Sequence, residues 1–194
     1  PVSPVKIEDG GLHLGMSAAL VNDRVNTAKN IVNYAIGMNN HMGSAATADP
    51  QLMTYLMTAL QEKHLFFLDS RTIGKSVAGK IAKEQGVRSL DRQIFLDDSN
   101  ELADIQHQFQ AAIQYTRKHG TAIAIGHPRA NTIAVLQARI NNLPEDIQLV
   151  GMGNLWRNEK VIPPKLFILL FTEMPAPTSM EPFEPVGLLR GIPK

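Results

Sequence analysis

The chain has 194 residues, enough for one domain, or one domain with a tail, and enough to bury a core without disulfides. Its 19 basic and 18 acidic residues leave a formal charge of +1 without a basic, aromatic-rich patch, which argues against nucleic-acid binding. The absence of cysteine excludes disulfides and thiolate chemistry, and the longest apolar run, residues 166–171, is too short to span a membrane.

Amphipathic helices and short apolar strands alternate along the chain, which is typical of a parallel α/β fold. Ser17 and Asp49 suit helix N-caps, and either Asp98 or Ser99 is expected to cap the long helix that ends at Gly120. In chain order the predicted elements are a loop (1–15), a helix (17–32), a strand (34–38), a helix (50–63), a strand (65–68), a helix (75–85), a short extended piece (87–90), a strand (93–96), a helix (99–119), a strand (121–125), a helix (131–142) and a strand (147–150).

Five such strands predict either an open doubly wound sheet or an incomplete (β/α) barrel, because a complete barrel needs about 250 residues. Residues 1–155 are predicted to form this domain. Residues 156–194 contain many prolines and no helical period, so we predict a tail, in which residues 166–172 add an edge strand or pack on the core. Because the chain starts at Pro1 and not at methionine, we expect an upstream segment that would hold any signal peptide.

Polar residues follow four predicted strands, at the position where parallel α/β folds gather functional groups. These strand ends read Asn39-Asn40-His41, Asp69-Ser70-Arg71-Thr72, Asp97-Asp98 and His127-Pro128-Arg129. His41 and His127 are candidate metal ligands or acid–base groups, since neutral imidazole binds zinc and its pKa of about 6.5 suits proton transfer. The alternative is that each histidine only hydrogen-bonds its own loop.

The carboxylates at these strand ends have two interpretations each. Asp69 could ligate a metal, orient a histidine or act as a base, or it could cap its loop in an Asx-turn. Asp97 is the better site candidate, because Asp98 and Glu101 resemble a helix start. Arg71 could hold substrate or pair with a neighbouring aspartate. Three neighbours of His41 would fix its loop or contact substrate: Asn39, Asn40 and Ser44.

Four segments together resemble the divergent polysaccharide deacetylase family of bacteria. They are Gly37-Met-Asn-Asn-His-Met-Gly-Ser44, Phe67-Leu-Asp-Ser-Arg-Thr72, Phe95-Leu-Asp-Asp98 and Ala124-Ile-Gly-His-Pro-Arg129. The resemblance implies a distorted (β/α) barrel with about seven strands instead of the regular eight, about five of them in this chain. It also implies an upstream strand that ends in paired aspartates, and export to the periplasm.

The same resemblance implies a function, the removal of N-acetyl groups from a cell-envelope glycan with the help of a divalent metal, expected to be zinc. His41 would be a metal ligand, and His127 a second ligand or the general acid. Asp69 and Asp97 would orient these groups or act as base. Two arginines would contact the carbohydrate: Arg71 and Arg129.

One position departs from the family pattern. Ordinary polysaccharide deacetylases carry a second histidine four residues after the first, and here that position is Ala45. The substitution favours an alternative function, in which a non-catalytic envelope protein keeps the fold and binds a glycan or a protein partner. A third interpretation is a hydrolase of another ester or amide that uses the same face.

Overall fold

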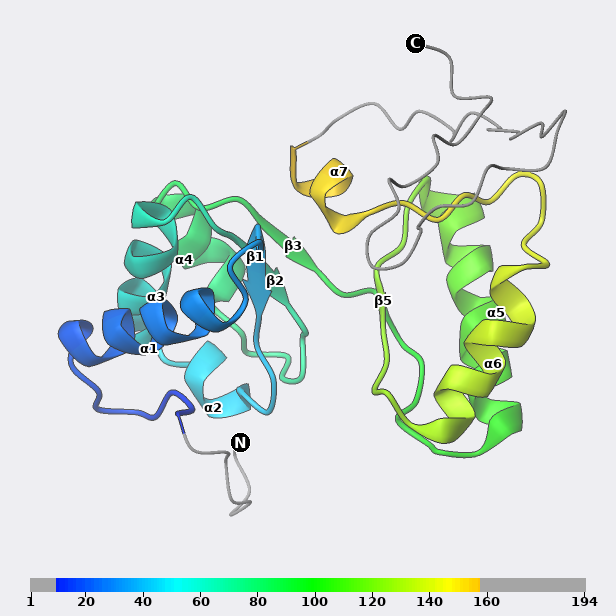
Figure 1. Ribbon diagram of the computed structural model, residues 1–194, viewed down its shortest axis with the longest axis horizontal. Coiled ribbons are helices and arrows are strands. Elements are labelled where there is room, and N and C mark those ends of the chain that lie inside the picture. The colour runs from blue at the N-terminus through cyan, green and yellow to red at the C-terminus, as the bar shows by residue number, and fades with distance from the viewer. Residues whose placement is uncertain (1–9, 158–194) are drawn as a thin grey trace, which may run out of the picture. The chain divides into compact units, whose positions relative to one another are not determined.

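The computed structural model describes residues 10–157, which belong to one compact unit, Pro1–Glu159 (Figure 1). Its helices are α1 (Ala18–Ile31), α2 (Ser44–Thr47), α3 (Pro50–Glu62), α4 (Ala78–Glu84), α5 (Leu102–His119), α6 (Ala130–Ile140) and α7 (Met152–Arg157). Its strands are β1 (Gly37–Asn39), β2 (Phe66–Asp69), β3 (Ser89–Asp91), β4 (Ile94–Phe95) and β5 (Ala124–Ile125). None of these described helices has the length and apolar character to cross a membrane. Nearly all of the predicted tail lies outside the described residues, including the edge strand expected over 166–172.

The strands form two parallel sheets. One has the order β1-β2-β3, with Gly37 opposite Phe66 and Phe67 opposite Ser89, and the other pairs β4 with β5. Because every described strand pair is parallel and helices connect the two strands of each pair, the predicted α/β class is confirmed. Two short sheets without a closed ring, among the residues described, are consistent with the predicted incomplete barrel.

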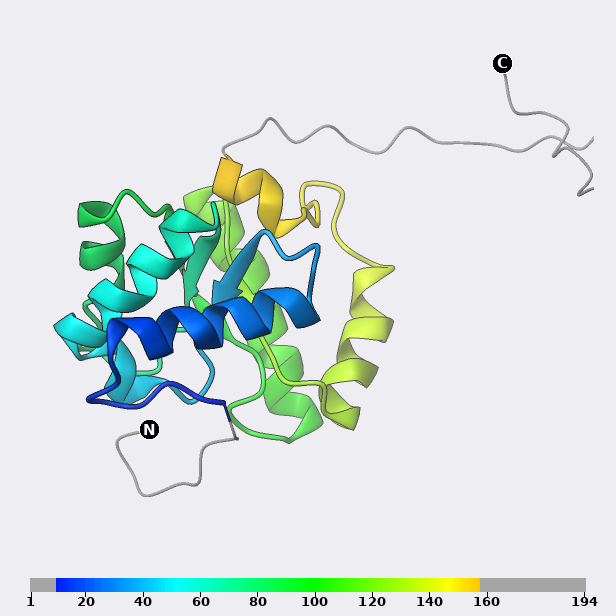
Figure 2. The ribbon, with the colours of Figure 1, turned by 60° about the vertical axis from the view of Figure 1, so that its left-hand side comes forward.

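The main core lies where α1, α3 and α4 pack together beside the β1-β2-β3 sheet (Figures 1 and 2). Its buried residues are Val21, Val25, Leu52, Met53, Leu56, Met57, Ala59, Leu60, Leu65, Phe67, Ala78, Ile81, Ala82 and Val87. Burying each of the larger side chains contributes roughly 1.5–3 kcal/mol, so this core supplies the rigid frame that holds the strand ends.

Strand β2 is buried on both faces, which explains why its sequence is a continuous apolar run. Successive strand residues point to opposite faces, so Phe67 enters the main core while Leu68 joins a second cluster with Ile123 and Trp156. Trp156 is 6% exposed, and its ring stacks on Phe66 with centroids 5.5 Å apart. Helix α7 thereby covers the second face of the strand that ends at Asp69.

The helix boundaries follow the sequence signals in most cases. Ser17 Oγ accepts a hydrogen bond from the backbone N–H of Leu20 at 3.3 Å, and Asp49 Oδ1 accepts one from Leu52 at 2.7 Å, so both predicted N-caps are confirmed. Gly120 ends α5, as predicted, and its φ of +86° is a backbone conformation that favours glycine.

Two predicted features are wrong, and one helix was not predicted. The long helix begins at Leu102 with Glu101 as N-cap, so neither Asp98 nor Ser99 caps it. Residues 147–150 form no strand, because their apolar run has no paired neighbour among the described strands, and Leu149 is 58% exposed. Residues 152–157 form α7, which the sequence did not predict; the buried Trp156 anchors this short helix.

Replacing Gly37 with alanine should destabilise the fold, because β1 approaches α7 too closely for a side chain. An added Cβ would lie 2.8 Å from Trp156 Cη2 and 2.9 Å from the backbone oxygen of Phe66. Overpacking of this kind costs about 1–3 kcal/mol, which urea unfolding would measure. Gly74→Ala is the matched control, since nothing lies within 4 Å of its added Cβ. Equal midpoints for the two variants would contradict this packing argument.

Candidate functional site

The candidate site is built from residues that follow the strands. β1 ends at Asn39 and β2 at Asp69, while Asp97 and His127 each come two residues after the ends of β4 and β5. Since the strands of each sheet are parallel, the polar residues at their carboxyl ends collect at one edge of that sheet.

Asp97 and His127 form the most firmly held pair of the site. The Asp97 side chain is fully buried, and its Oδ1 lies 3.0 Å from His127 Nδ1. Its Oδ2 accepts hydrogen bonds from the backbone N–H of His127 and from Thr132 Oγ1, each at 2.7 Å. Arg129 Nη1 donates to the Asp97 backbone oxygen at 2.7 Å. Both carboxylate oxygens are therefore engaged, and the imidazole is oriented with its Nε2 left for another partner.

The electrostatics of this pair favour an ionised carboxylate. Burial by itself raises the pKa of Asp97, but the hydrogen bonds from Thr132 and from the backbone and ring of His127 outweigh it. The pKa of the Asp97 carboxyl therefore lies below its ordinary value. A charged Asp97 holds the Nδ1 proton of the ring, which is the arrangement by which carboxylates commonly orient a functional histidine.

His41 and His127 lie side by side, although 86 residues separate them in the sequence. Their ring centroids are 5.8 Å apart with an interplanar angle of 74°. Phe95 lies on another side of His127, with centroids 5.5 Å apart. His41 is exposed, whereas the His127 side chain is 33% exposed. The structure thus brings together the two histidines that the sequence singled out.

The loop that carries His41 is tied to the loop after β2. Ser70 N donates to Asn40 Oδ1 at 2.8 Å, and Ser70 Oγ donates to the Asn40 backbone oxygen at 2.7 Å. Asn39 Nδ2 donates to Ser70 Oγ at 3.3 Å, and Ser44 Oγ donates to Thr72 Oγ1 at 3.2 Å. These contacts match the interpretation in which Asn39, Asn40 and Ser44 fix the loop, while their contact with substrate stays a prediction.

Asp69 is fully buried within its own loop. Its Oδ1 accepts a hydrogen bond from the backbone N–H of Arg71 at 2.8 Å, and its Oδ2 accepts one from Ser76 Oγ at 2.5 Å. This is the loop-capping arrangement that the sequence offered as the alternative to a catalytic role. Arg71 has φ +51°, a sparsely populated conformation, and its Nη1 lies 3.8 Å from Asp91 Oδ2.

Arg92 is a structural member of the site that sequence reasoning missed. Its Nε donates to the Ser70 backbone oxygen at 2.6 Å and its Nη2 to that of Arg71 at 3.0 Å, while its guanidinium lies 4.9 Å from the centroid of Phe95. Burial lowers the pKa of Arg92, against the opposing effect of Asp69 and Asp98. The Arg92 side chain joins the loop after β2 to the aromatic ring beside His127. Because Arg92 lies between two short strands without a recognisable motif, the sequence alone does not indicate this role.

The fit of these residues to a divalent metal is partial. Within the described part of the chain, no group of three or more histidine and carboxylate side chains is arranged to hold a metal ion. Two imidazoles on one tetrahedral zinc would place their centroids roughly 5 Å apart, so the 5.8 Å between His41 and His127 is close to the spacing of a ligand pair. Asp69 and Asp97 already have both oxygens engaged, and Ala45 in α2 has no donor side chain.

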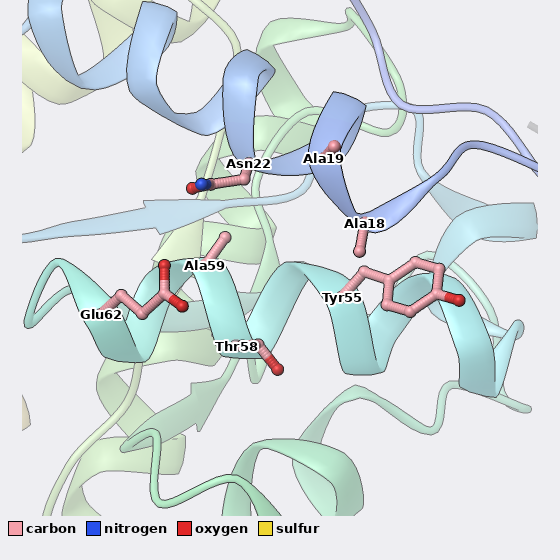
Figure 3. Close-up of a pocket in the computed structure, with 7 residues that line it drawn as sticks. All are labelled: Ala18, Ala19, Asn22, Tyr55, Thr58, Ala59 and Glu62. Carbon is pink, nitrogen blue, oxygen red and sulfur yellow. The ribbon is translucent and has the colours of Figure 1, made fainter.

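A cavity of about 230 Å³ lies away from the strand ends, between α1 and α3 (Figure 3). Its polar lining comes from Asn22, Tyr55, Thr58 and Glu62, and it contains none of the predicted site residues. Asn22 Oδ1 already accepts a hydrogen bond from Lys63 Nζ at 2.6 Å. The strand-end residues therefore remain the candidate site.

Comparisons with known proteins place the chain in a family. The family model of divergent polysaccharide deacetylases matches residues 1–156. An uncharacterized protein of Haemophilus influenzae is 90% identical over 194 residues, all of this chain and 69% of that protein. The protein YibQ of Escherichia coli K12 is 43% identical over 168 residues, which are 85% of this chain and 53% of YibQ.

A solved structure shows the same fold. The crystal structure of an uncharacterized protein from Agrobacterium tumefaciens C58 matches 64% of this chain and 50% of its own chain, with a TM-score of 0.61 and 25% sequence identity. This chain spans about half the length of that protein and of YibQ. From the match over residues 1–156 and the relationship to YibQ, we conclude that the chain belongs to the divergent polysaccharide deacetylase family.

Proposed function

We propose that this chain carries the strand-end site of a metal-dependent carbohydrate de-N-acetylase that acts on a cell-envelope glycan. Membership of the divergent polysaccharide deacetylase family supports a carbohydrate as the partner class. The absence of cysteine and the family resemblance agree with a periplasmic or otherwise exported protein.

The observation that carries this proposal is the geometry around His127. Its Nδ1 is held by the buried Asp97, and the ring of His41 lies 5.8 Å away, centroid to centroid. Amide hydrolysis needs a group that donates a proton to the departing amine, and an imidazole oriented by a carboxylate suits that task. We therefore assign Asp97 to the orientation of His127, and not to a free catalytic base.

A divalent metal, most suitably zinc, would be held by His41 through a neutral imidazole nitrogen. His127 would be either a second ligand or the general acid, because an Nε2 bound to a metal has no proton to donate. When bound, such an ion supplies an activated water molecule and polarises the acetyl carbonyl. His41, alone or with His127, is the part of a ligand set that the described residues supply, and the upstream aspartates that the family resemblance implies would complete it. Arg71 and Arg129 would contact the glycan, and Asp69 would keep the loop of Arg71 in place.

Loss of His41 should abolish stoichiometric zinc binding by the full-length protein, measured by calorimetry, and His127→Ala should abolish it only where His127 is the second ligand. Acetate release from an N-acetylated glycan should fall about 10²- to 10⁴-fold in His127→Ala, the usual contribution of a proton-transferring group. His107→Ala is the matched control, because His107 is exposed on α5. Full acetate release by His127→Ala would overturn the proposed role of this residue.

A second candidate function follows from the incomplete ligand set. Ala45 replaces the usual second histidine, and no three-ligand group occurs among the described residues. The alternative is a non-catalytic protein that binds a glycan or a protein partner with the same face. Glycan binding that survives in His41→Ala, together with no zinc binding and no acetate release by the wild-type protein, would establish this alternative instead.

A further inference from the structure

A cavity of about 200 Å³ lies behind the loop that carries His41. Helices α1 and α3 and strands β1 and β2 form its wall, which is mainly apolar: Val25, Met53 and Phe67 are 3%, 1% and 1% exposed. Its polar lining residues are Arg24, Asn39, Asn40 and His41, and no aspartate or glutamate of residues 10–157 lines it. Within this part of the chain, the cavity therefore combines an apolar wall with a cationic side and no compensating acid.

Two hydrogen-bond donors of this lining lack an acceptor. Arg24 Nε and Asn40 Nδ2 are both shielded from solvent and have no hydrogen-bond partner. The orientation of the Asn40 amide is fixed, because its Oδ1 accepts a hydrogen bond from Ser70 N at 2.8 Å and cannot exchange places with Nδ2. Leaving a buried donor unpaired costs about 1–3 kcal/mol, so such donors in a native protein require an explanation.

Arg24 is also an uncompensated charge within the described part of the chain, because none of the ion pairs formed there includes it. A guanidinium in a partly buried setting is normally paired with a carboxylate or phosphate, and its planar fork matches a carboxylate in particular. A ligand that brings a carboxylate would compensate this charge, and it would satisfy the two unpaired donors only after a shift of the lining, because both are shielded from solvent.

We propose that this cavity, which we name the Arg24 pocket, binds a short-chain aliphatic carboxylate. The carboxylate pairs with the Arg24 guanidinium, and the chain lies against Val25, Met53 and Phe67. A cavity of 150 Å³ holds benzene, so one of about 200 Å³ accommodates roughly six to eight non-hydrogen atoms, as in butyrate to hexanoate. This binding does not depend on deacetylation or on a metal.

Hexanoate binding to the full-length, zinc-free protein, followed by calorimetry and by NMR of the methionine and valine methyl groups, tests the proposal. We expect saturable binding with shifts at Met53 and Val25. Arg24→Gln should weaken hexanoate binding at least about tenfold, the effect of losing one charged hydrogen bond. The uncharged isostere hexanamide should bind the wild-type protein at least about tenfold more weakly than hexanoate does.

Two further variants distinguish a loss of binding from a loss of folding. Arg24→Lys keeps the charge and should bind hexanoate within a few-fold of wild type, so that a loss confined to Arg24→Gln reports the charge. Arg88→Gln removes an exposed arginine elsewhere and should bind as wild type does. The proposal is overturned if hexanoate does not bind, if hexanamide binds equally well, or if the shifts map away from the Arg24 pocket. None of these outcomes bears on acetate release, so the two proposals fail independently.

Discussion

An Asp97→Ala variant should lose about 3–5 kcal/mol of unfolding free energy, because a buried acceptor is removed from several donors at once. Asp97 is fully buried, and its carboxylate accepts hydrogen bonds from Thr132 Oγ1 and the backbone N–H of His127 at 2.7 Å and faces His127 Nδ1 at 3.0 Å. All three donors would be left without that acceptor. Urea unfolding followed by circular dichroism measures the loss.

The neighbouring Asp98 is the matched control for this change. It carries the same charge but is exposed, so Asp98→Ala should change stability by no more than about 0.5 kcal/mol. Thr132→Val removes one donor and leaves the carboxylate, so we expect an intermediate loss of about 1 kcal/mol. Equal stabilities of Asp97→Ala and Asp98→Ala would contradict the structure at this position.

Asp97 should also make the unfolding free energy of the protein depend on pH. The pKa of Asp97 is depressed in the folded state, so the stabilisation that its ionised carboxylate provides is fully present above the unfolded-state pKa of about 3.9. This stabilisation is lost as the pH falls through the folded-state pKa. The stability difference between wild type and Asp97→Asn should therefore be constant near neutral pH and shrink below about pH 4. A difference that stayed constant down to pH 2 would contradict a depressed pKa.

Replacing Trp156 with alanine should destabilise the domain by about 3–5 kcal/mol, the usual cost of emptying a buried aromatic site. The ring is 6% exposed, stacks on Phe66, and donates from Nε1 to the Phe67 backbone oxygen at 3.2 Å. Since it covers the second face of β2, its loss should also loosen the strand that ends at Asp69. Trp156 is the only tryptophan of the chain, so circular dichroism should replace fluorescence in the measurement.

Two variants serve as references for the loss of stability in Trp156→Ala. Tyr34→Ala removes an aromatic ring that is 98% exposed, and it should leave stability nearly unchanged. Trp156→Phe keeps a ring in the site but removes the Nε1 donor, so its effect should lie between the two. If Trp156→Ala unfolds at the same urea concentration as Tyr34→Ala, helix α7 contributes nothing to the core described here.

The residues of the candidate site could be predicted from the sequence, but their hydrogen-bond partners could not. The sequence identified His41, Asp97 and His127 because parallel strands place their carboxyl ends together. It left the role of Asp69 open, and the structure shows both of its oxygens held by Arg71 N and Ser76 Oγ. Such hydrogen bonds depend on how a loop folds back on itself, for which local sequence patterns contain no information.

The sequence by itself determined the α/β class, most helix boundaries and the family, because these follow from apolar periodicity, capping residues and short contiguous motifs. Only the tertiary structure decided that residues 147–150 form no strand and that Trp156 belongs to the core. It also decided that Arg92 and Thr132 support the site, since their partners lie at distant positions in the chain. Pairing and burial depend on neighbours that are remote in sequence, and these neighbours exist only once the chain has folded.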